Sequence, residues 1–283
     1  MNSSSISITN ISENTCMRHE LLAQHGQSFL INYNSNHYLF DVGEVYSGFI
    51  HNLNKILPTG IDAIKDIFIS HRHLDHCGSF TGLVANLKNQ HIYVLSDLGV
   101  EDLKPIDGEK YLYCDKSDSN QYNVSLGGQG LQNIRDYSST ITLDKPLEIE
   151  PGFWVTGPVG DKILEQAVII DLKERGIVII VGCSHPTLPA LIKKGQEITG
   201  NNKVFGVIGG FHFKDSTPED FEQYINYLKE LNPTFIAPGH CTGSEAMQEL
   251  KKRMPDIVKL SKTGSFGTGN SIDLYPDLKF RFV

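Results

Sequence analysis

The sequence contains no hydrophobic run long enough to cross a membrane. A membrane-spanning helix needs about 18 or more consecutive apolar residues, and no stretch of this 283-residue chain approaches that length. The first residues, Met1 to Ser5, also lack the basic and apolar regions of a signal peptide. We therefore expect a cytoplasmic protein that has no membrane partner.

Cysteine is scarce, and its count is odd. A disulfide framework normally uses an even number of cysteines in an exported chain. The absence of an export signal therefore predicts reduced thiols. The five cysteines are Cys16, Cys77, Cys114, Cys183 and Cys241.

Positive charge is also in deficit. The chain has 25 Lys and Arg residues against 33 Asp and Glu residues, for a formal net charge of −8. A general nucleic-acid surface normally needs basic patches. We expect a small-molecule substrate and no nucleic-acid partner, and the sequence does not indicate the oligomeric state.

What the chain does contain is a dense group of metal-binding residue types. Three histidines and a carboxylate, His71, His73, Asp75 and His76, fall within six residues. Imidazole and carboxylate together suit Zn²⁺, Fe²⁺ or Mn²⁺. In an extended segment His71 and His73 leave the backbone on the same side. The adjacent Asp75 and His76 project differently and can hold a second ion.

This group follows a predicted strand and precedes a predicted helix. Residues 66–70 form an apolar run typical of a buried strand. After them, Phe80, Leu83, Val84 and Leu87 have helical spacing, and Ser79 is placed to cap the helix. The candidate ligands therefore lie in a loop at the carboxyl end of a strand, where open α/β sheets usually place their sites.

The second half of the chain repeats this arrangement. Apolar runs at 167–172 and 177–181 predict a hairpin, and 204–208 and 234–237 predict two further strands around a helix that opens at Thr217. Three of these strands lead directly to a histidine. These histidines are His185, His212 and His240, and we expect them to converge on the first group.

Elsewhere the patterns predict a single α/β domain, 1–283. The amino-terminal part predicts a hairpin of 28–33 with 37–40 and a helix over 45–57. Between about 101 and 161 the pattern weakens, and we expect an irregular elaboration that either covers the mouth of the site or forms a plain surface insertion. The sequence shows no long repeat.

The segment His71-Arg72-His73-Leu74-Asp75-His76 resembles the H-x-H-x-D-H motif of the metallo-β-lactamase superfamily. This resemblance implies a four-layered αββα sandwich and two divalent metal ions, with zinc as the first choice and manganese or iron as alternatives. Four further motifs resemble the subgroup of metal-dependent hydrolases known as β-lactamase superfamily II, which includes an archaeal dihydropterin ribofuranosylaminobenzene phosphate synthase. They are 25–29, 182–185, 209–212 and 238–243.

The candidate ligands depart from the commonest superfamily pattern. No histidine occurs between His91 and His185, and Gly182-Cys183 stands where most members have Gly-Asp. We expect His185 to replace the missing imidazole. The predicted ligand sets are therefore His71, His73 and His185 for one ion, and Asp75, His76 and His240 for the other.

Three further residues have predicted roles. The resemblance implies that Asp41 supports the metal loop from behind. Cys183 is either a thiolate ligand or a small buried residue, and its residue type favours the second. His212 either binds metal or donates a hydrogen bond to the substrate.

The function that we predict is metal-dependent hydrolysis of a small ester, lactone, thioester or phosphodiester. Asp75 would orient the attacking hydroxide and accept a proton. The alternatives are a pterin-related synthase or transferase acting on a phosphorylated substrate, a mononuclear-iron dioxygenase, and a degenerate protein that binds a ligand without turnover.

Overall fold

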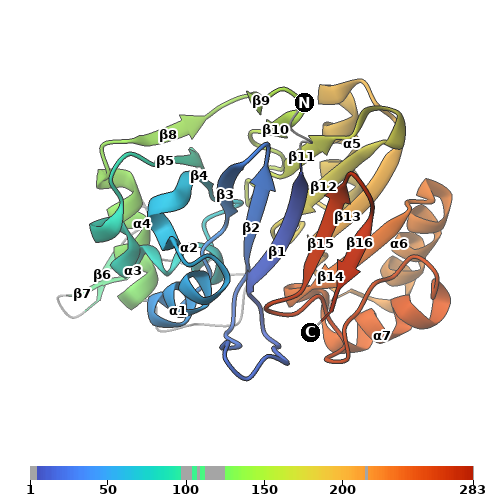
Figure 1. Cartoon of the computed structure of the whole chain (residues 1–283), viewed down its shortest axis with the longest axis horizontal. Coiled ribbons are helices and arrows are strands. Elements are labelled where there is room, and N and C mark those ends of the chain that lie inside the picture. The colour runs from blue at the N-terminus through green and yellow to red at the C-terminus, as the bar shows by residue number, and fades with distance from the viewer. Residues whose placement is uncertain (1–4, 97–103, 107–108, 112–124, 214–215, 283) are drawn as a thin grey trace.

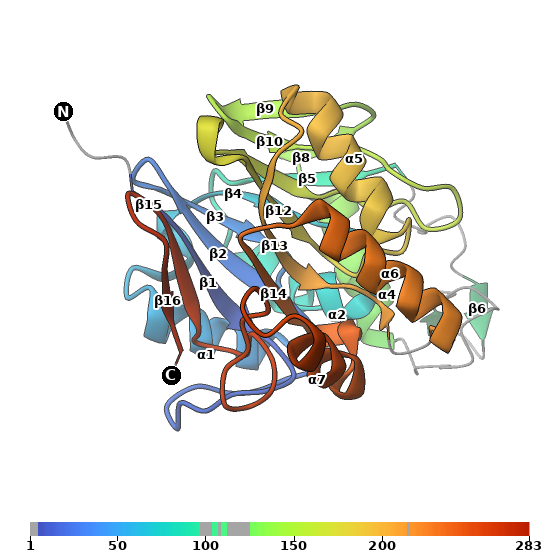
Figure 2. The same ribbon diagram turned by 90° about the vertical axis from the view of Figure 1, so that its right-hand side faces the viewer.

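Strand-forming runs of apolar residues build two sheets that face each other in the computed structural model of this chain (Figures 1 and 2). The structure describes residues 5–96, 104–106, 109–111, 125–213 and 216–282. Among these residues helices cover the outer face of each sheet, which gives four layers in the order helix, sheet, sheet, helix.

The first sheet has eight strands in the order β16-β15-β1-β2-β3-β4-β5-β8. Strands β3, β4, β5 and β8 are parallel neighbours, and the others pair antiparallel. The bounds are β1 Ile6–Ser12, β2 Ser28–Tyr33, β3 Asn36–Phe40, β4 Ile64–Phe68, β5 His91–Leu95, β8 Thr140–Leu143, β15 Ser271–Tyr275 and β16 Lys279–Arg281.

The second sheet has six strands in the order β14-β13-β12-β11-β10-β9. Strands β12, β13 and β14 are parallel, and the rest form antiparallel pairs. The bounds are β9 Leu147–Glu150, β10 Phe153–Val155, β11 Val168–Asp171, β12 Ile177–Val181, β13 Val204–Gly210 and β14 Phe235–Gly239. A separate short hairpin is made by β6 Lys104–Ile106 and β7 Glu109–Tyr111.

Helices pack on the outer faces of the sheets (Figure 2). The first sheet carries α1 Tyr46–Ile56, α2 Leu74–Cys77, α3 Phe80–Leu83 and α4 Ser125–Asp136, and the second carries α5 Leu188–Thr199, α6 Pro218–Leu231 and α7 Ser244–Arg253. Short 3₁₀ helices are η1 Gly60–Ala63, η2 Val84–Asn86, η4 Lys173–Arg175 and η6 His240–Thr242.

Three apolar cores hold these layers together. Between the sheets, the Phe153 ring packs edge-on against the rings of Tyr38 and Phe68. Outside the first sheet, Phe49 and Leu53 of α1 belong to a second core, and the apolar sides of α5, α6 and α7 form a third core outside the second sheet. Full burial of one such side chain stabilises a fold by roughly 1.5–3 kcal/mol.

Most of the expected elements are present. The hairpin of β2 and β3, helix α1, and strands β4, β11, β12, β13 and β14 lie where the sequence predicts them. The predicted helix after Ser79 is shorter than expected, since α3 ends at Leu83 and a 3₁₀ turn follows. Ser79 does not cap it, because its own backbone is already helical and an N-cap residue needs an extended conformation.

The stretch 101–161 contributes to both sheets. Within it β8 extends the first sheet, and β9 and β10 extend the second. Residues 101–103, 107–108 and 112–124 lie outside the described residues, so the predicted elaboration and the single-domain division, 1–283, remain predictions.

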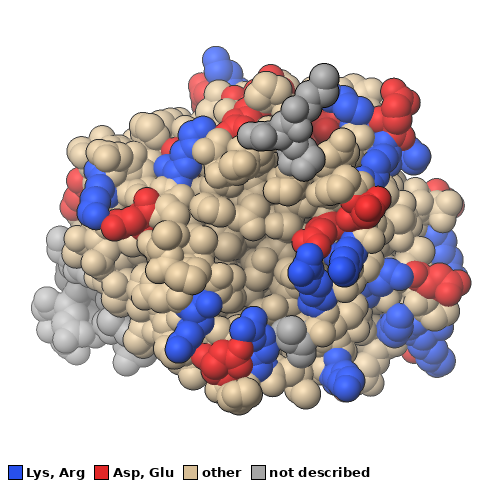
Figure 3. Space-filling view, viewed as in Figure 1, with Lys and Arg blue, Asp and Glu red and all other residues tan. Residues whose placement is uncertain are grey.

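Two surface properties bear on the expected partners. No helix in the described part of the chain is both long and apolar enough to span a membrane. Figure 3 shows basic and acidic side chains interspersed around the edge of the face seen in Figure 1. Cys16, Cys77, Cys183 and Cys241 form no disulfide among the described residues, and Cys114 lies outside them.

Candidate metal centre

The candidate centre lies where strand ends of both sheets meet. Strands β4, β12, β13 and β14 end immediately before the predicted residues, and parallel neighbours bring those ends to one edge of a sheet. Several residues there have a positive φ that side chains other than glycine rarely adopt. They are Asp41, Ser184, His212 and His240, and such strain is typical of functional sites.

Asp41 supports the first loop, as the resemblance implies. This fully buried carboxylate accepts hydrogen bonds from the backbone N–H of Ser70 at 2.7 Å and from the Ser70 hydroxyl at 2.8 Å. Its other contact is His76 Nδ1 at 2.6 Å. Because Nδ1 is engaged, the Nε2 atom of His76 faces the centre, which is the arrangement typical of a metal-binding histidine.

The structure brings the first predicted set together. The rings of His71, His73 and His185 lie 4.7–4.8 Å apart, centroid to centroid, in each pairing. His185 Nε2 is 3.2 Å from His73 Nδ1. Residues 114 positions apart in the sequence therefore present their nitrogens to one small volume.

The second predicted set is also assembled. Asp75 Oδ2 lies 2.9 Å from His240 Nε2 and 3.8 Å from His76 Nε2. The rings of His76 and His240 are 5.0 Å apart, and both side chains are almost fully buried. His25, which is half exposed, approaches the same carboxylate to 3.8 Å and contacts Glu44 at 2.9 Å.

Cys183 lies between the two sets. Its sulfur is 3.2 Å from His76 Nε2. It groups with His71 and His185 on one side and with His76 and His240 on the other, with all ligand atoms of each group within 4.8 Å of one another. This geometry favours the ligand role over the packing role that the residue type suggested. Cys183 is the residue that stands where most superfamily members have the aspartate of Gly-Asp.

Two buried glutamates that the sequence analysis missed hold the other ligand loops. Glu165 accepts four backbone N–H groups, from Gly182, Cys183, Ser184 and His185, at 2.9–3.1 Å. Glu13 accepts the N–H of His240 at 2.8 Å. No spacing pattern reveals them, because each carboxylate binds backbone groups, which leave no residue-type signal in the sequence.

Close packing explains two glycines beside the centre. A Cβ atom on Gly182 would lie 2.3 Å from the Ser70 hydroxyl, and one on Gly26 would lie 2.3 Å from the carbonyl oxygen of Asp75. Gly26 also has φ of +117°. Only glycine allows the Glu165-held loop and the segment after His25 to approach the metal loop this closely.

Burial keeps several of these imidazoles neutral. It lowers the pKa of His71 well below its usual range and that of His185 to about 2, and neighbouring imidazoles reinforce both shifts. Burial also lowers the pKa of His240, against the opposing pull of Asp75. A neutral imidazole has a free lone pair, as a metal ligand requires.

The pKa values of His76, Asp75 and Cys183 follow a different pattern. Burial disfavours the charged form of His76, but Asp41 and Asp75 outweigh burial and raise its pKa to about 9. Asp75 is also desolvated, yet His76 and His240 lower its pKa well below the usual value. Burial raises the pKa of the Cys183 thiol, and a hydrogen bond involving Cys241 adds to this shift.

An unpaired nitrogen tests whether the residues fit a metal ion. His71 Nε2 is buried and makes no hydrogen bond. Leaving such a group unpaired normally costs about 1–3 kcal/mol. His71 belongs to one of the ligand groups described above, so the donor set fits divalent cations that prefer imidazole, carboxylate and thiolate ligands.

His212 stands at the margin of this cluster. Its ring lies 4.6 Å from the ring of His185, and its side chain also lines a groove that runs along α6. The position suits a residue that contacts substrate next to the metal ions.

Comparison with solved structures identifies the fold. The chain aligns with Tm1679, described as a metal-dependent hydrolase of the β-lactamase superfamily, with a TM-score of 0.66 and 22% identity over 90% of this chain and 95% of that one. It also aligns with the metallo-β-lactamase fold protein YhfI from Bacillus subtilis, with a TM-score of 0.58 and 14% identity over 95% and 99% of the two chains. The chain has the metallo-β-lactamase fold. This confirms the expected α/β sandwich.

The chain is also similar to curated proteins, one of which has a stated activity. No family model matches the chain. The 7,8-dihydropterin-6-methyl-4-(β-D-ribofuranosyl)-aminobenzene-5′-phosphate synthase of Methanocaldococcus jannaschii is 29% identical over 265 residues, which cover 81% of this chain and 86% of the synthase. An uncharacterized protein of the same organism is 24% identical, over 85% of this chain and 92% of its own.

The synthase similarity corrects the predicted function. We expected hydrolysis of a small ester, lactone, thioester or phosphodiester, and this expectation is wrong, since the curated relative with a stated activity is a synthase. The H-x-H-x-D-H motif indicates candidate metal donors and carries no information about which bond reacts. The same ions can stabilise charge in hydrolysis or in transfer to another acceptor. The predicted alternative, a pterin-related synthase acting on a phosphorylated substrate, has the better support.

Proposed function

We propose that this protein is a metal-dependent synthase that joins a dihydropterin to a ribosylaminobenzene phosphate. The observation that carries the proposal is the similarity to the archaeal synthase over most of both chains. The assembled donor cluster adds support, because the residues needed to hold metal ions converge in this chain although they are distributed from position 71 to position 240.

In this proposal each predicted set would hold one divalent cation. His71, His73 and His185 would hold the first, and Asp75, His76 and His240 would hold the second. Cys183, which groups with residues of both sets, would supply a thiolate ligand. Zinc is the first metal to test, because it accepts all three kinds of ligand.

The reaction couples one bond that breaks to one that forms. The aminobenzene nitrogen attacks the methylene carbon on the pterin, the bond from that carbon to a diphosphate oxygen breaks, and the nitrogen loses a proton. Bound cations would supply charge stabilisation for the departing diphosphate. His212, beside the centre and open to the groove, is positioned to accept the proton from the amine.

A coupled-product assay tests this function. The purified protein is incubated with 6-hydroxymethyl-7,8-dihydropterin diphosphate and 4-(β-D-ribofuranosyl)aminobenzene 5′-phosphate, and mass spectrometry follows the products. We expect the joined product and free diphosphate in equal amounts. Diphosphate release without the joined product, or no reaction in metal-loaded protein, would contradict the proposal.

Variants of the centre provide the control for that assay. We expect Asp75→Asn to keep the fold, measured by circular dichroism, and to lose at least about 100-fold in turnover, because a charged ligand is lost. The exposed Glu245→Gln in the first turn of α7 removes the same charge elsewhere and should retain full activity.

Metal content is a second prediction. Elemental mass spectrometry on protein purified without a metal-affinity tag should give about two zinc, manganese or iron ions per chain. The number of metal ions per chain should fall in His73→Ala, His185→Ala and Cys183→Ser. A ratio that is unchanged in Cys183→Ser would remove the thiolate from the ligand set.

A further inference from the structure

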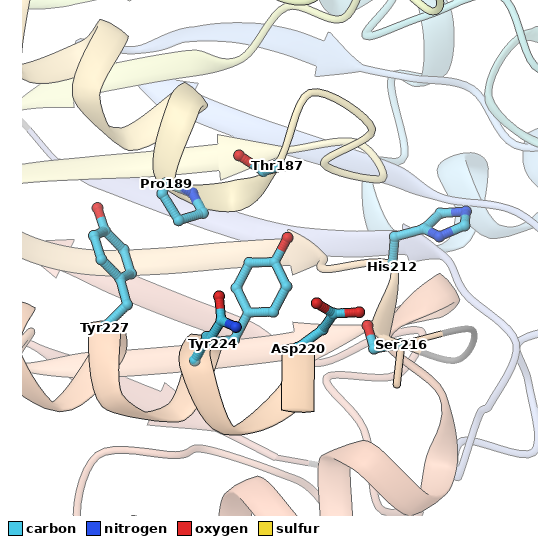
Figure 4. Close-up of a pocket in the computed structure, with 8 residues that line it drawn as sticks. Thr187, Pro189, His212, Ser216, Asp220, Tyr224 and Tyr227 are labelled. Carbon is cyan, nitrogen blue, oxygen red and sulfur yellow. The ribbon is translucent and has the colours of Figure 1, made fainter. Parts of the chain in front are cut away.

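A groove of about 520 Å³ runs along α6 and ends at His212 (Figure 4). This volume lies within the usual range for small-molecule sites. In Figure 4, Tyr227 and His212 lie at opposite ends, with Tyr224 and Asp220 between them. Since the His212 ring is 4.6 Å from the ring of His185, the groove leads directly to the candidate metal centre.

One face of α6 supplies most of the polar lining. Asp220, Gln223, Tyr224 and Tyr227 follow each other at intervals of three, one and three residues, which places them on one side of a helix. The groove-facing residues include two aromatic rings beside one carboxylate. Tyr224 and Tyr227 are partly buried and also pack against the third core, so each ring has one side on the core and an edge at the groove.

The aromatic part of the groove is held firmly. Tyr224 packs against Phe213 with ring centroids 4.5 Å apart, and Phe213 in turn packs against Phe221 at 5.6 Å. Burial raises the pKa of Tyr224 and of Tyr227, so both remain neutral phenols at physiological pH. A fixed ring at the wall of a groove suits stacking or edge contacts with a flat ligand ring.

The carboxylate of Asp220 is oriented by the start of its own helix. Its Oδ2 accepts a hydrogen bond from the Thr217 hydroxyl at 2.8 Å, and the Asp220 backbone N–H donates to the same hydroxyl at 3.2 Å. The side chain is exposed to the groove. An anchored carboxylate of this kind accepts well from two adjacent N–H donors on one edge of a ligand.

Charge decides which substrate fits here. Among the described residues that line the groove none is lysine or arginine, and Asp220 is the acidic one. A ribose phosphate dianion would meet a negative wall. A pterin ring is uncharged and presents two adjacent donors, its 2-amino group and its N3–H, to an acceptor.

We propose that the α6 groove binds the dihydropterin ring, with the Asp220 carboxylate accepting from the 2-amino and N3–H groups and Tyr224 contacting the ring. This inference rests on the proposed function and specifies where one of its two substrates lies. The ring's methylene substituent then points along the groove toward His212 and the metal centre, and the phosphorylated aminobenzene approaches from outside the groove.

The test is the binding specificity of Asp220→Asn. Equilibrium dialysis measures the affinity for 6-hydroxymethyl-7,8-dihydropterin and for the matching lumazine, which has a 2-oxo group in place of the 2-amino group. In the variant a side-chain NH₂ group replaces one carboxylate oxygen of Asp220. This NH₂ group would face the 2-amino group of the pterin, which is also a donor, but it can donate a hydrogen bond to the 2-oxo group of the lumazine. We expect pterin binding to weaken 10-fold to 100-fold and lumazine binding to strengthen.

Two further variants separate this effect from general damage. Glu219→Gln changes the neighbouring exposed carboxylate in the first turn of α6 and should leave both affinities unchanged. Tyr224→Leu should weaken both ligands alike, because it removes ring contact without altering the hydrogen-bond pattern.

Each outcome bears on one of the two proposals. Unchanged pterin and lumazine affinities in Asp220→Asn, in a protein that still forms the joined product, would overturn the groove assignment and leave the synthase intact. If the wild-type protein neither forms the product nor binds the pterin, the proposed function fails and the groove assignment fails with it.

Discussion

At the scale of single residues, three buried carboxylates shape the centre through backbone hydrogen bonds. Asp41 holds the loop that carries His71, Glu165 holds the loop that carries Cys183, and Glu13 holds the N–H of His240. All three are at most 2% exposed. Each donor loop therefore has its own anchor, and the positions of the donor atoms depend on residues that need not touch a ligand.

Glu165→Gln tests this anchoring. The amide can accept from some of the four N–H groups, but its NH₂ group faces the others, so the loop should loosen. We expect metal affinity to fall about 10-fold to 100-fold, as for other residues that support ligands from behind, with the secondary structure retained. Competition with a chelator of known affinity measures the change.

The matched control is Glu174→Gln, which removes an exposed carboxylate from η4. Metal affinity should be unchanged there. Equal affinities in both variants would mean that the Glu165 carboxylate is not needed to place Cys183 and His185.

Residue types indicated the candidate donors, and the resemblance indicated one anchor, Asp41, but neither indicated the two glutamates. His71, His73, His76 and the later histidines could be predicted because imidazoles at strand ends are rare and chemically specific. Glu165 and Glu13 could not be predicted, since a carboxylate that binds N–H groups across long sequence distances resembles any surface glutamate until the fold is known.

At the scale of elements, α6 connects the core to the groove. Its apolar side, including Ile225 and Leu228, packs into the third core, and the adjoining face lines the groove. The helix begins at Pro218, and Thr217 caps it by accepting the N–H of Asp220. The same cap that starts the helix also orients the carboxylate assigned to the pterin.

Thr217→Ala should lower the free energy of unfolding by about 1 kcal/mol, because one helix-terminal N–H loses its acceptor. For a chain of this size the melting temperature should fall by about 2–4 °C. Thr217→Ser keeps the hydroxyl and should restore most of the loss. A melting temperature that is the same in Thr217→Ala and wild type would show that the cap contributes little.

Helix α6 also shows which elements the sequence predicts well. A threonine followed by proline at the start of a helix gives a strong local signal, and the predicted helix that opens at Thr217 is present as α6. Helices α5 and α7 and strands β15 and β16 were not predicted, although the structure contains them. Strands β15 and β16 depend on pairing with β1 across the whole chain, which a local pattern does not encode.

At the scale of the whole molecule, a tyrosine joins the two sheets. Tyr33 at the end of β2 donates a hydrogen bond to the carbonyl oxygen of Pro151, in the turn between β9 and β10, at 2.6 Å. Its ring packs on Phe153 with centroids 5.2 Å apart. Burial, reinforced by Glu150, raises the pKa of this phenol to about 12.

This shift predicts how stability changes at high pH. The unfolded chain has a tyrosine pKa of about 10, so above that value it releases a proton that the folded chain retains. The contribution of Tyr33 to the free energy of unfolding is therefore complete below pH 10. It is lost as the pH rises toward 12, which lowers the free energy of unfolding by about 1–2 kcal/mol. Urea denaturation between pH 8 and 11.5 measures it.

Tyr33→Phe is the comparison. At pH 8 its free energy of unfolding should be about 1 kcal/mol lower than that of wild type, because the hydrogen bond to Pro151 is lost. That free energy should also fall less steeply with rising pH than in wild type. Other tyrosines titrate equally in both proteins and cancel in the difference. A stability difference that stays constant from pH 8 to pH 11.5 would contradict the assignment.

The bond between Glu13 and the N–H of His240 also constrains how the protein is made, because it joins positions 227 residues apart. A ribosome delivers the amino-terminal part of a chain first. The loop with His71 and its Asp41 anchor can form while synthesis continues, but Glu13 waits for a partner that emerges near the end. A fragment released early by the ribosome thus carries at most one of the two candidate ligand sets complete, and both sets are present only on a chain translated past His240.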